Sequence, residues 1–333
     1  MGKYVVTVDA GTTNTRVFLW NKYRMMVASA KSETGVRNTA IDGNNELLKK
    51  TIHDCIEAVL EQSRITYEDV DKVIACGMIT SNVGLVEIPH VYAPTGLNEL
   101  AEQAKEILLK DICPLPILFI PGVKNNIRKV NLDNFEEMDI MRGEEVETMA
   151  ILNDLPKRFP YMLVLPGSHT KFVAVNKEGQ ITGCLTTITG ELLASITNET
   201  IIADAVGKQF VNEESYDREM MLKGFDVSEY SGIGRACFSA RILNMFSIKD
   251  KEKLANYILG VCLATDVQAV KNSKALCVDP EMTVIVSGKN PLRKAIVDIM
   301  QHDGYFKKVQ EYIPNSMFPL SAIGAYLVAD RMK

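Results

Sequence analysis

Short apolar stretches separated by turn residues open the chain. Residues 3–9 and 15–20 are rich in Val, Thr and Phe, and the turn-forming segment Gly11-Thr-Thr-Asn14 separates them, which predicts a hairpin of two strands. A third strand is predicted at 24–32. Residues 44–62 carry apolar side chains at three-to-four spacing, which indicates a helix with one buried face. A strand at 72–76, a helix at 98–109 and a strand at 117–120 complete the order β-β-β-α-β-α-β.

The same order of elements recurs after residue 160. Strands are predicted at 161–165, 171–175 and 180–187, followed by helices at 190–206, 213–223, 231–246 and 251–271. The last predicted elements are a strand at 282–286, a helix at 291–302, a strand at 308–313 and a helix at 318–332. The second half therefore matches the first, with extra helices before its fourth strand.

The repeat is visible at single residues as well. When Gly11 is placed over Gly167, Gly11-Thr-Thr-Asn-Thr-Arg-Val17 lies over Gly167-Ser-His-Thr-Lys-Phe-Val173. Each segment is a small, hydroxyl-rich turn with a basic residue soon after it. An internal repeat of this kind predicts an α/β protein of two duplicated domains, each a five-stranded mixed sheet flanked by helices, with a cleft between them.

The predicted division places an N-terminal domain at 1–142, a C-terminal domain at 143–317 and a final helix at 318–333 that returns to the first domain. A helix at about 143–152 joins the two domains, and no Gly/Ser-rich or Pro-rich linker lies between them, which favours closure about a hinge.

Composition narrows the class of protein. The chain has 333 residues, of which 47% are hydrophobic and 24% charged, enough for two sizeable cores. The formal net charge of −5 argues against a nucleic-acid partner, which would need a basic face. No apolar run approaches the ~20 residues of a membrane span, and the first residues have no signal-peptide pattern, so we expect a cytoplasmic protein without a membrane partner. The 7 cysteines are scattered, which is typical of buried, inert thiols rather than of a zinc site.

The segment Asp9-Ala-Gly-Thr-Thr-Asn14 is the clearest candidate for phosphate binding. Asp9 ends a predicted strand and is suited to holding Mg²⁺, directly or through water. Gly11 lets the backbone approach a phosphate, and Thr12, Thr13 and Asn14 offer amide and hydroxyl donors. The alternative is an ordinary hairpin turn, in which these residue types are common.

A second matching turn strengthens the phosphate interpretation. Gly167, Ser168, His169 and Thr170 are predicted to hold the phosphates of ATP from the other side of the cleft. Ser287-Gly288 lies at a strand–turn–helix junction and is assigned to the adenosine side, where a helix N-terminus offers free amides. From its residues alone this junction reads equally well as a plain glycine turn.

The motifs that follow one another along the chain resemble a known family. They are Asp9-Ala-Gly-Thr-Thr-Asn14, Gly77-Met-Ile-Thr-Ser-Asn-Val-Gly84, Arg142-Gly-Glu-Glu145, Leu165-Pro-Gly-Ser-His-Thr-Lys-Phe172, Thr189-Gly-Glu-Leu192 and Ser287-Gly288. In this order the chain is similar to the 2-dehydro-3-deoxygalactonokinases, a branch of the actin-like sugar-kinase superfamily. The resemblance implies RNase H-like domains, ATP, Mg²⁺ and phosphoryl transfer to the C6 hydroxyl of a 2-keto-3-deoxy sugar acid.

Three positions depart from the pattern of that family. Ala10, Leu85 and Phe172 stand where its members usually or often carry Trp. The fold expectation is unchanged by these departures, whereas the exact sugar acid stays open.

Phosphoryl transfer needs positioning, charge neutralisation and an acceptor for the hydroxyl proton. The second turn, residues 165–171, contains no acid, so the acceptor is sought elsewhere. Glu145 is preferred over Glu191, since it would begin the joining helix, where the helix dipole favours a carboxylate. Both also read as salt-bridge partners that fix the domain junction, and His169 is a direct competitor for the role of base.

The remaining candidates concern the substrate. Arg142 and Lys171 are predicted to neutralise the substrate carboxylate or the migrating phosphoryl group. Ser81, Asn82 and Glu144 complete the predicted sugar-acid site, and Lys171 also reads as an ordinary solvated lysine.

Other functions remain open at this stage. The chain could phosphorylate another keto acid or polyol, or be a nucleotide-dependent sensor or activator of the same superfamily. A homodimer is also considered.

Overall fold

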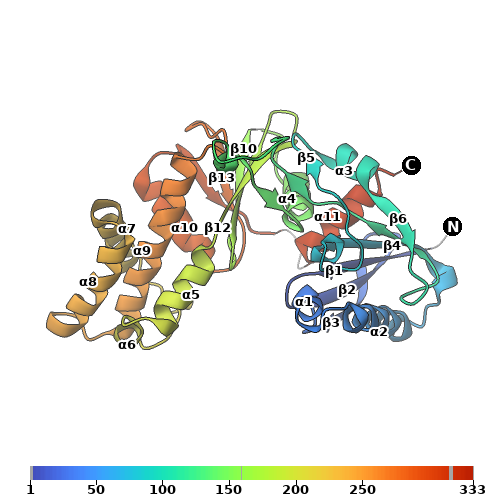
Figure 1. Cartoon of the computed structure of the whole chain (residues 1–333), viewed down its shortest axis with the longest axis horizontal. Helices are drawn as coiled ribbons and strands as arrows, with labels where there is room; N and C mark the ends of the chain where they lie inside the picture. The colour runs from blue at the N-terminus through green and yellow to red at the C-terminus, as the bar shows by residue number, and fades with distance from the viewer. Residues whose placement is uncertain (1–2, 159, 315–317, 333) are drawn as a thin grey trace.

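The computed structural model describes residues 3–158, 160–314 and 318–332, which form two lobes joined at one end (Figure 1). The first lobe is built on a six-stranded sheet in the order β3-β2-β1-β4-β7-β6. Its strands are β1 (Tyr4–Ala10), β2 (Thr15–Asn21), β3 (Met26–Ser32), β4 (Val70–Gly77), β6 (Lys105–Leu108) and β7 (Pro116–Phe119). β1, β2 and β3 run antiparallel, and β1, β4 and β7 run parallel.

The second lobe is built on a five-stranded sheet in the order β12-β11-β10-β13-β14. Its strands are β10 (Tyr161–Leu165), β11 (Thr170–Val175), β12 (Ile181–Thr187), β13 (Thr283–Val286) and β14 (Lys308–Glu311). The first three run antiparallel, and β10, β13 and β14 run parallel. The second sheet therefore has the same strand order and directions as five of the six strands in the first.

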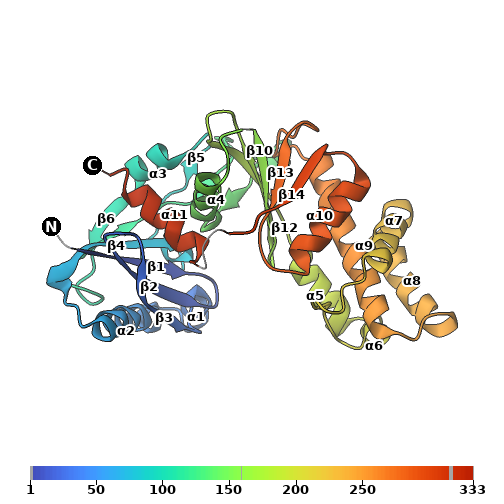
Figure 2. The same cartoon turned by 180° about the vertical axis from the view of Figure 1, so that it is seen from behind.

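Helices cover both faces of each sheet. In the first lobe α1 (Val36–Asp42) and α2 (Glu46–Ser63) lie on one side, while α11 (Leu320–Ala329) packs on the other against β1 and β4. Figure 2 shows α11 beside the joining helix α4 (Glu144–Asp154), so the C-terminal helix does return to the first lobe. The second lobe adds α5 (Thr189–Glu199), α6 (Ala203–Val206), α7 (Arg218–Ser231), α8 (Ile233–Phe246), α9 (Lys251–Lys271) and α10 (Leu292–Asp303).

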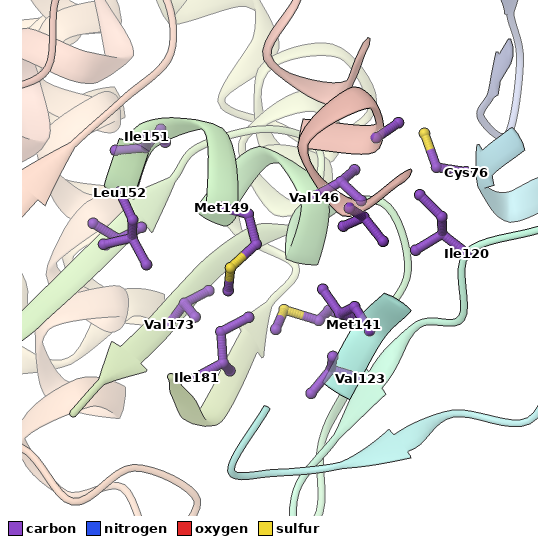
Figure 3. Packing of buried hydrophobic residues seen from close by; sticks show 14 of the residues in the cluster. Cys76, Ile120, Val123, Met141, Val146, Met149, Ile151, Leu152, Val173 and Ile181 are labelled. Carbon is purple, nitrogen blue, oxygen red and sulfur yellow. The ribbon is translucent and has the colours of Figure 1, made fainter. Parts of the chain in front are cut away.

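A continuous apolar core joins the lobes at α4. Side chains from β4, α4, β11 and β12 meet there, among them Cys76, Val146, Met149 and Val173 (Figure 3). On β10, alternate residues face opposite ways, as the two-residue period of a strand dictates: Leu163 belongs to this shared core, and Val164 packs under α7, α9 and α10. The lobes are thus not independent cores connected by a loose linker.

A small third sheet lies at this junction and was not predicted. It comprises β5 (Val91–Tyr92), β8 (Val123–Lys124) and β9 (Ile140–Met141), in the order β5-β8-β9. Thr95 pairs with Ile181 of β12, so the small sheet is attached to the edge of the second sheet. Long-range pairing of two-residue strands leaves no periodic signal in the sequence.

Several predicted elements need correction. The helix predicted at 98–109 is wrong in its second half, because α3 (Leu97–Gln103) ends early and Lys105–Leu108 pairs antiparallel with β7. The first sheet consequently has six strands, not five. The helix predicted at 190–206 is divided into α5 and α6, that at 213–223 begins only at Arg218, and α1 was missed. Among the described residues, no helix is long and apolar enough to span a bilayer.

Candidate active site

The first candidate phosphate turn connects β1 to β2. The turn is closed by a hydrogen bond from the Gly11 amide to the Asn14 carbonyl, at 2.9 Å. The start of α1 supports it from behind, because the Val36 and Arg37 amides donate to the Gly11 and Thr12 carbonyls at 3.1 and 2.9 Å. Gly35 permits this close packing, since a Cβ there would lie 2.5 Å from the Gly11 carbonyl oxygen. Thr12 and Thr13 are left exposed.

The second turn connects β10 to β11 and is supported in the same way. The start of α5 lies behind it, and the Glu191 amide donates to the Ser168 carbonyl at 3.1 Å. A Cβ on Gly190 would lie 2.2 Å from the Gly167 carbonyl oxygen. Thr189-Gly190 therefore occupies the place behind the second turn that Thr34-Gly35 occupies behind the first. The dipeptide in the first lobe was not singled out from the sequence.

A cavity of about 730 Å³ lies beside the second turn; Gly11, Thr12, Thr13 and Asn14 of the first turn are not part of its wall. Its walls combine one side from the first lobe and α4 with a larger side from the second lobe. The lining residues are Arg16, Glu147, Pro166, Gly167, Ser168, Gly190, Leu193, Ala194, Thr197, Gln209, Phe210, Val211, Ala255, Leu259, Gly288, Lys289, Asn290, Pro291 and Leu292. A partly apolar cavity of this size, with Gly167, Gly190 and Gly288 in its wall and the Arg16 cation on the side of the first lobe, suits a nucleotide.

Asp9 lies near the end of β1, beside Arg16 of the cavity wall. Its carboxylate accepts a hydrogen bond from the Ser321 hydroxyl at 2.8 Å and lies 3.7 Å from the Arg16 guanidinium. Burial raises the pKa of Asp9, and the Ser321 bond and the Arg16 charge oppose that rise. The carboxylate is thus short of positive charge in this structure.

Glu147, which sequence reasoning missed, is a second acid at the cavity wall. It lies one helical turn after Gly143 on α4. The pKa of Glu147 is raised to about 8. Burial is the main cause, the charges of Asp9 and Glu144 add to the rise, and the charge of Arg16 opposes it. An acid whose pKa is raised by neighbouring acids is relieved when a cation binds nearby.

These acids fit a magnesium ion carried in with a nucleotide. No cluster of three or more metal-ligating side chains occurs in the parts of the chain that the structure describes. Mg²⁺ in kinases, however, needs only one or two carboxylates, with water and phosphate oxygens completing its shell. Asp9, in the position predicted for it, is the residue suited to that role.

The segment Arg142–Glu145 begins the joining helix, as predicted. Glu145 is fully buried; its Oε2 accepts the Gly143 amide at 2.7 Å, and its Oε1 has no partner among the described residues. Burial raises the pKa of Glu145 to about 8, with the neighbouring charge of Glu144 adding to the rise. Glu145 is not part of the cavity wall, and the Glu144 carboxylate accepts the Arg142 amide at 3.0 Å.

Arg142 and Lys171, predicted to neutralise the substrate or the phosphoryl group, both have hydrogen-bond partners within the protein. The Arg142 guanidinium donates to the Thr80 hydroxyl and to the Ile88 carbonyl, the latter at 3.0 Å, so it already has partners in the first lobe. The Lys171 ammonium is buried and donates to the Ile140 carbonyl at 2.8 Å and to the Thr186 hydroxyl. Neither side chain lines the cavity. Arg142 and Lys171 thereby connect separate elements of the fold, because a cation removed from water must have its donors satisfied.

His169 and Glu191 lie together at the exposed rim. The His169 Nε2 is 3.1 Å from a Glu191 carboxylate oxygen, and both side chains are more than half exposed. Thr170 is buried at the start of β11. The structure brings this pair beside the second turn but leaves both side chains out of the cavity wall.

Ser81 and Asn82 occupy the loop after β4. The Ser81 hydroxyl donates to the Met78 carbonyl at 2.7 Å and is buried, whereas Asn82 is exposed. Neither residue lines the large cavity.

Ser287 and Gly288 follow β13, next to the second turn. Gly288 has a φ of +95°, and a Cβ there would lie 2.8 Å from the ring of Pro166. Gly288 lines the cavity together with Lys289 and Asn290, which sequence reasoning did not single out. Ser287 is buried, and its amide donates to the Val164 carbonyl at 2.9 Å.

The missed residues carried weak signals. Arg16 is the basic residue after the first turn, in the repeat position that Lys171 nearly occupies. Glu147 shares a helix face with Glu144, three residues earlier. Nothing in the sequence distinguishes either from a solvated charge, because whether Arg16 and Glu147 meet depends on how the first lobe and α4 come together in the folded chain.

Two matching turns, an acid at the end of β1, a cavity walled by both lobes and a match to a carbohydrate-kinase profile define the class of protein as a sugar kinase. The profile of the 2-keto-3-deoxy-galactonokinase family matches residues 9–313, and the chain belongs to that family. The resemblance to this family, inferred from the sequence motifs, is therefore confirmed.

Individual relatives agree with this assignment. The chain is 23% identical to a 2-dehydro-3-deoxygalactonokinase of Escherichia coli (strain K12), over 80% of each chain. It is 26% identical to a protein of Rhizobium meliloti (strain 1021) named for the same activity, a match that spans 62% of this chain and 60% of the relative. A crystal structure from Sinorhizobium meliloti, described by the same enzyme name, superposes with a TM-score of 0.73 at 18% identity, covering 98% of this chain and 97% of the other. At that identity the superposition supports the fold.

Proposed function

We propose that the protein transfers the γ-phosphoryl group of ATP to the C6 hydroxyl of 2-dehydro-3-deoxy-D-galactonate or a close 2-keto-3-deoxy sugar acid. The observation that carries the proposal is the pair of equivalent glycine turns, each supported by a helix start, together with a cavity lined by the second turn and by Arg16, which follows the first turn. Membership of the 2-keto-3-deoxy-galactonokinase family supports the substrate class. A reaction that consumes ATP fits the cytoplasm.

The two lobes are proposed to be duplicated RNase H-like domains. The matching order of five strands in each sheet supports this. Residues 1–142 would serve the sugar acid, residues 143–317 the adenosine, and 318–333 would complete the first domain. The shared core at α4 suits a hinge. The homodimer stays a prediction.

The phosphates are proposed to lie between the two turns. Thr12, Thr13 and Asn14 would offer amides and hydroxyls from the first side. Gly167 and Ser168 of the cavity wall would do so from the second, with Arg16 adding a cation. Asp9 would hold Mg²⁺, which supplies charge neutralisation for the γ-phosphate when bound. Ser287 and Gly288 would border the ribose or base.

Glu145 is proposed as the acceptor of the hydroxyl proton. Its pKa of about 8 makes it a stronger base than an exposed glutamate once it is ionised. Its unpartnered Oε1 is a buried acceptor available to a hydroxyl donor. Glu147 is the alternative with a place in the cavity wall, and Glu191 follows it.

The sugar-acid site is proposed to be the region bounded by Ser81, Asn82, Arg142 and Glu144. The contacts of Arg142 with Thr80 and Ile88 support a positioning role for the loop after β4. The absence of Trp at Ala10, Leu85 and Phe172 leaves a second candidate: a kinase for a related keto acid.

A coupled assay of ADP release against a panel of sugar acids, sugars and polyols tests the function. We expect the highest kcat/KM for a 2-keto-3-deoxy C6 acid, and a requirement for Mg²⁺ and ATP. A product phosphorylated at C6, identified by NMR, would confirm the position. Turnover of neutral sugars alone would contradict the proposed substrate class, and no turnover with any acceptor despite nucleotide binding would contradict kinase activity.

A further inference from the structure

A buried acid on α9 lies behind the second phosphate turn, far from it in sequence. Asp266 is only 2% exposed, and its Oδ1 accepts a hydrogen bond from the Thr189 hydroxyl. The Thr187 hydroxyl lies 3.2 Å from the Thr189 hydroxyl and also lowers the pKa of this carboxylate. Burial raises the pKa of Asp266 to about 6, and both hydroxyls oppose the rise. Its Oδ2 has no partner among the described residues.

Thr189 connects this acid to the second turn through the two residues that follow it, Gly190 and Glu191. It is the first residue of α5, and the next residue, Gly190, packs its Cα against the backbone of Gly167 and Ser168. The residue after that, Glu191, donates its amide to the Ser168 carbonyl at 3.1 Å. A shift at Thr189 therefore moves the surface on which the turn rests, because Gly190 leaves no intervening side chain to absorb it.

In the first lobe, residues close in sequence hold the start of the equivalent helix, α1. There the Asn38 side chain on α1 accepts the Gly35 amide at 3.2 Å, and the Thr34 carbonyl accepts the Thr15 hydroxyl at 2.8 Å. In the second lobe the cap residue of α5, Ile188, offers no side-chain hydrogen bond. The start of α5 is held instead by a residue of α9, 77 positions away from Thr189.

A burial cost accompanies this arrangement. A carboxylate with one unpartnered oxygen in the core destabilises the fold relative to an apolar side chain of similar size. If position 266 contributed only to packing, an apolar residue there would stabilise the fold more than Asp266 does. What the carboxylate adds is a fixed anchor for two hydroxyls.

We propose that Asp266 is a positioning residue for nucleotide binding: it holds Thr187 and Thr189, these fix the start of α5, and α5 fixes the turn Gly167–Ser168 against the phosphates. The inference rests on the proposed function as an ATP-dependent kinase. Asp266 does not touch the nucleotide in this scheme, since it is not part of the cavity wall.

The test compares Asp266→Asn, Thr189→Val and the double variant. Binding of ATP with Mg²⁺ is measured by isothermal titration without sugar acid, and the KM values for both substrates are measured separately. We expect each single variant to weaken nucleotide binding about tenfold, equivalent to ~1.4 kcal/mol, with the KM of the sugar acid within about twofold of wild type. The double variant should be no worse than the more affected single variant, because both changes break one chain of contacts. Thr189→Ser, which keeps the hydroxyl, should restore affinity.

Ser228→Ala is the matched control. Ser228 is buried on α7 and donates to the α9 carbonyl of Val261 at 3.1 Å, so the variant disturbs the same helices without a link to the turn. It should lower the melting temperature and leave nucleotide affinity unchanged.

Three outcomes would overturn the inference: wild-type affinity in folded Asp266→Asn and Thr189→Val proteins, equal weakening of both substrates, or strictly additive losses in the double variant. If Asp266→Asn does not fold, the pair Thr189→Val and Thr189→Ser decides. A wild-type protein that binds no nucleotide would instead defeat the proposed function itself.

Discussion

At the scale of single residues, the site is a set of acids short of positive charge. Asp9, Glu145 and Glu147 all have raised pKa values, chiefly because of burial, and the nearby cation Arg16 offsets only part of this for Asp9 and Glu147. Of these three, Glu147 lines the cavity, and perturbed acids that face a cleft are typical of functional sites. Their energetic cost is recovered when a cation and a substrate bind.

Asp9→Asn should keep the protein folded and lower turnover by about 100-fold or more. The amide preserves the shape and the contact with Ser321, but it weakens the charge neutralisation that Mg²⁺ supplies. Steady-state kinetics with Mg²⁺ titration measures this. Asp71→Asn, an exposed position on β4, serves as the control and should be neutral. Full activity in folded Asp9→Asn would remove Asp9 from the site.

Glu145→Gln should cut turnover severely while the binding of ATP and sugar acid stays near normal, since a neutral amide cannot accept a proton. His169→Asn should cost less, as one lost contact of roughly 1–3 kcal/mol at the exposed rim. Single-turnover kinetics with separate binding measurements distinguishes them. Near-normal turnover in Glu145→Gln would send the search to Glu147 and then to Glu191.

The pH dependence provides a second readout of the same variant. Folding raises the pKa of Glu145 from 4.5 to about 8, so between these values the native state holds a proton that the unfolded state has lost. The free energy of unfolding should therefore fall as pH rises through this window, and Glu145→Gln should flatten the fall by roughly 1–3 kcal/mol. Glu147 has the same sign and leaves part of the slope. In wild type, kcat/KM should rise toward pH 8 if Glu145 is the base.

At the scale of elements, each phosphate turn depends on a neighbour that approaches without a side chain. Gly35 and Gly190 serve this purpose from the helix starts, and Gly288 serves it from the loop after β13. Gly35 and Gly190 therefore contact the backbone of the turns directly, and Gly288 contacts the ring of Pro166 beside the second turn. A Cβ at any of the three would prevent this contact.

Gly288→Val should raise the ATP requirement far more than the sugar-acid requirement. Its φ of +95° strains any L-residue, and the new side chain would push against Pro166 beside the second turn. Gly304 is a matched control, because it has a φ of +74° with nothing within 4 Å of an added Cβ. Gly304→Val should lose stability without a change in ATP affinity. Equal weakening of both ligands in Gly288→Val would indicate a general folding defect, and an unchanged ATP affinity would move the adenosine site elsewhere.

At the scale of the whole molecule, one buried asparagine joins segments that the sequence keeps far apart. Asn125 follows β8; its amide donates to the Glu137 and Cys184 carbonyls, both at 3.0 Å, and its Oδ1 accepts the Cys184 amide at 2.8 Å. The small sheet is thereby attached to β12 of the second lobe.

Asn125→Ala should lower the free energy of unfolding by about 2–4 kcal/mol, because several buried backbone groups lose their partner together. Urea denaturation measures the change, and Asn98→Ala at an exposed position of α3 should stay within about 0.5 kcal/mol of wild type. A loss no larger than that of the control would mean that the small sheet is held by its apolar contacts alone.

Periodicity and turn chemistry in the sequence were sufficient for the repeated strand order, the joining helix, the C-terminal helix and both glycine turns. These features are local: a run of alternating or three-to-four-spaced apolar residues reports its own structure. The motifs were also sufficient for the family. The placement of Asp9 at the end of β1 followed directly, because it depends on one strand only.

Only the tertiary structure decided which side chains meet. It paired Lys105–Leu108 with β7, satisfied Lys171 inside the protein, set Glu147 into the cavity wall and brought Asp266 behind Thr189. Each of these contacts joins segments whose spacing in the chain carries no information about their distance in space. Charged side chains read as solvated in a sequence become binding groups or internal anchors when packing removes them from water, and that removal is a property of the folded whole.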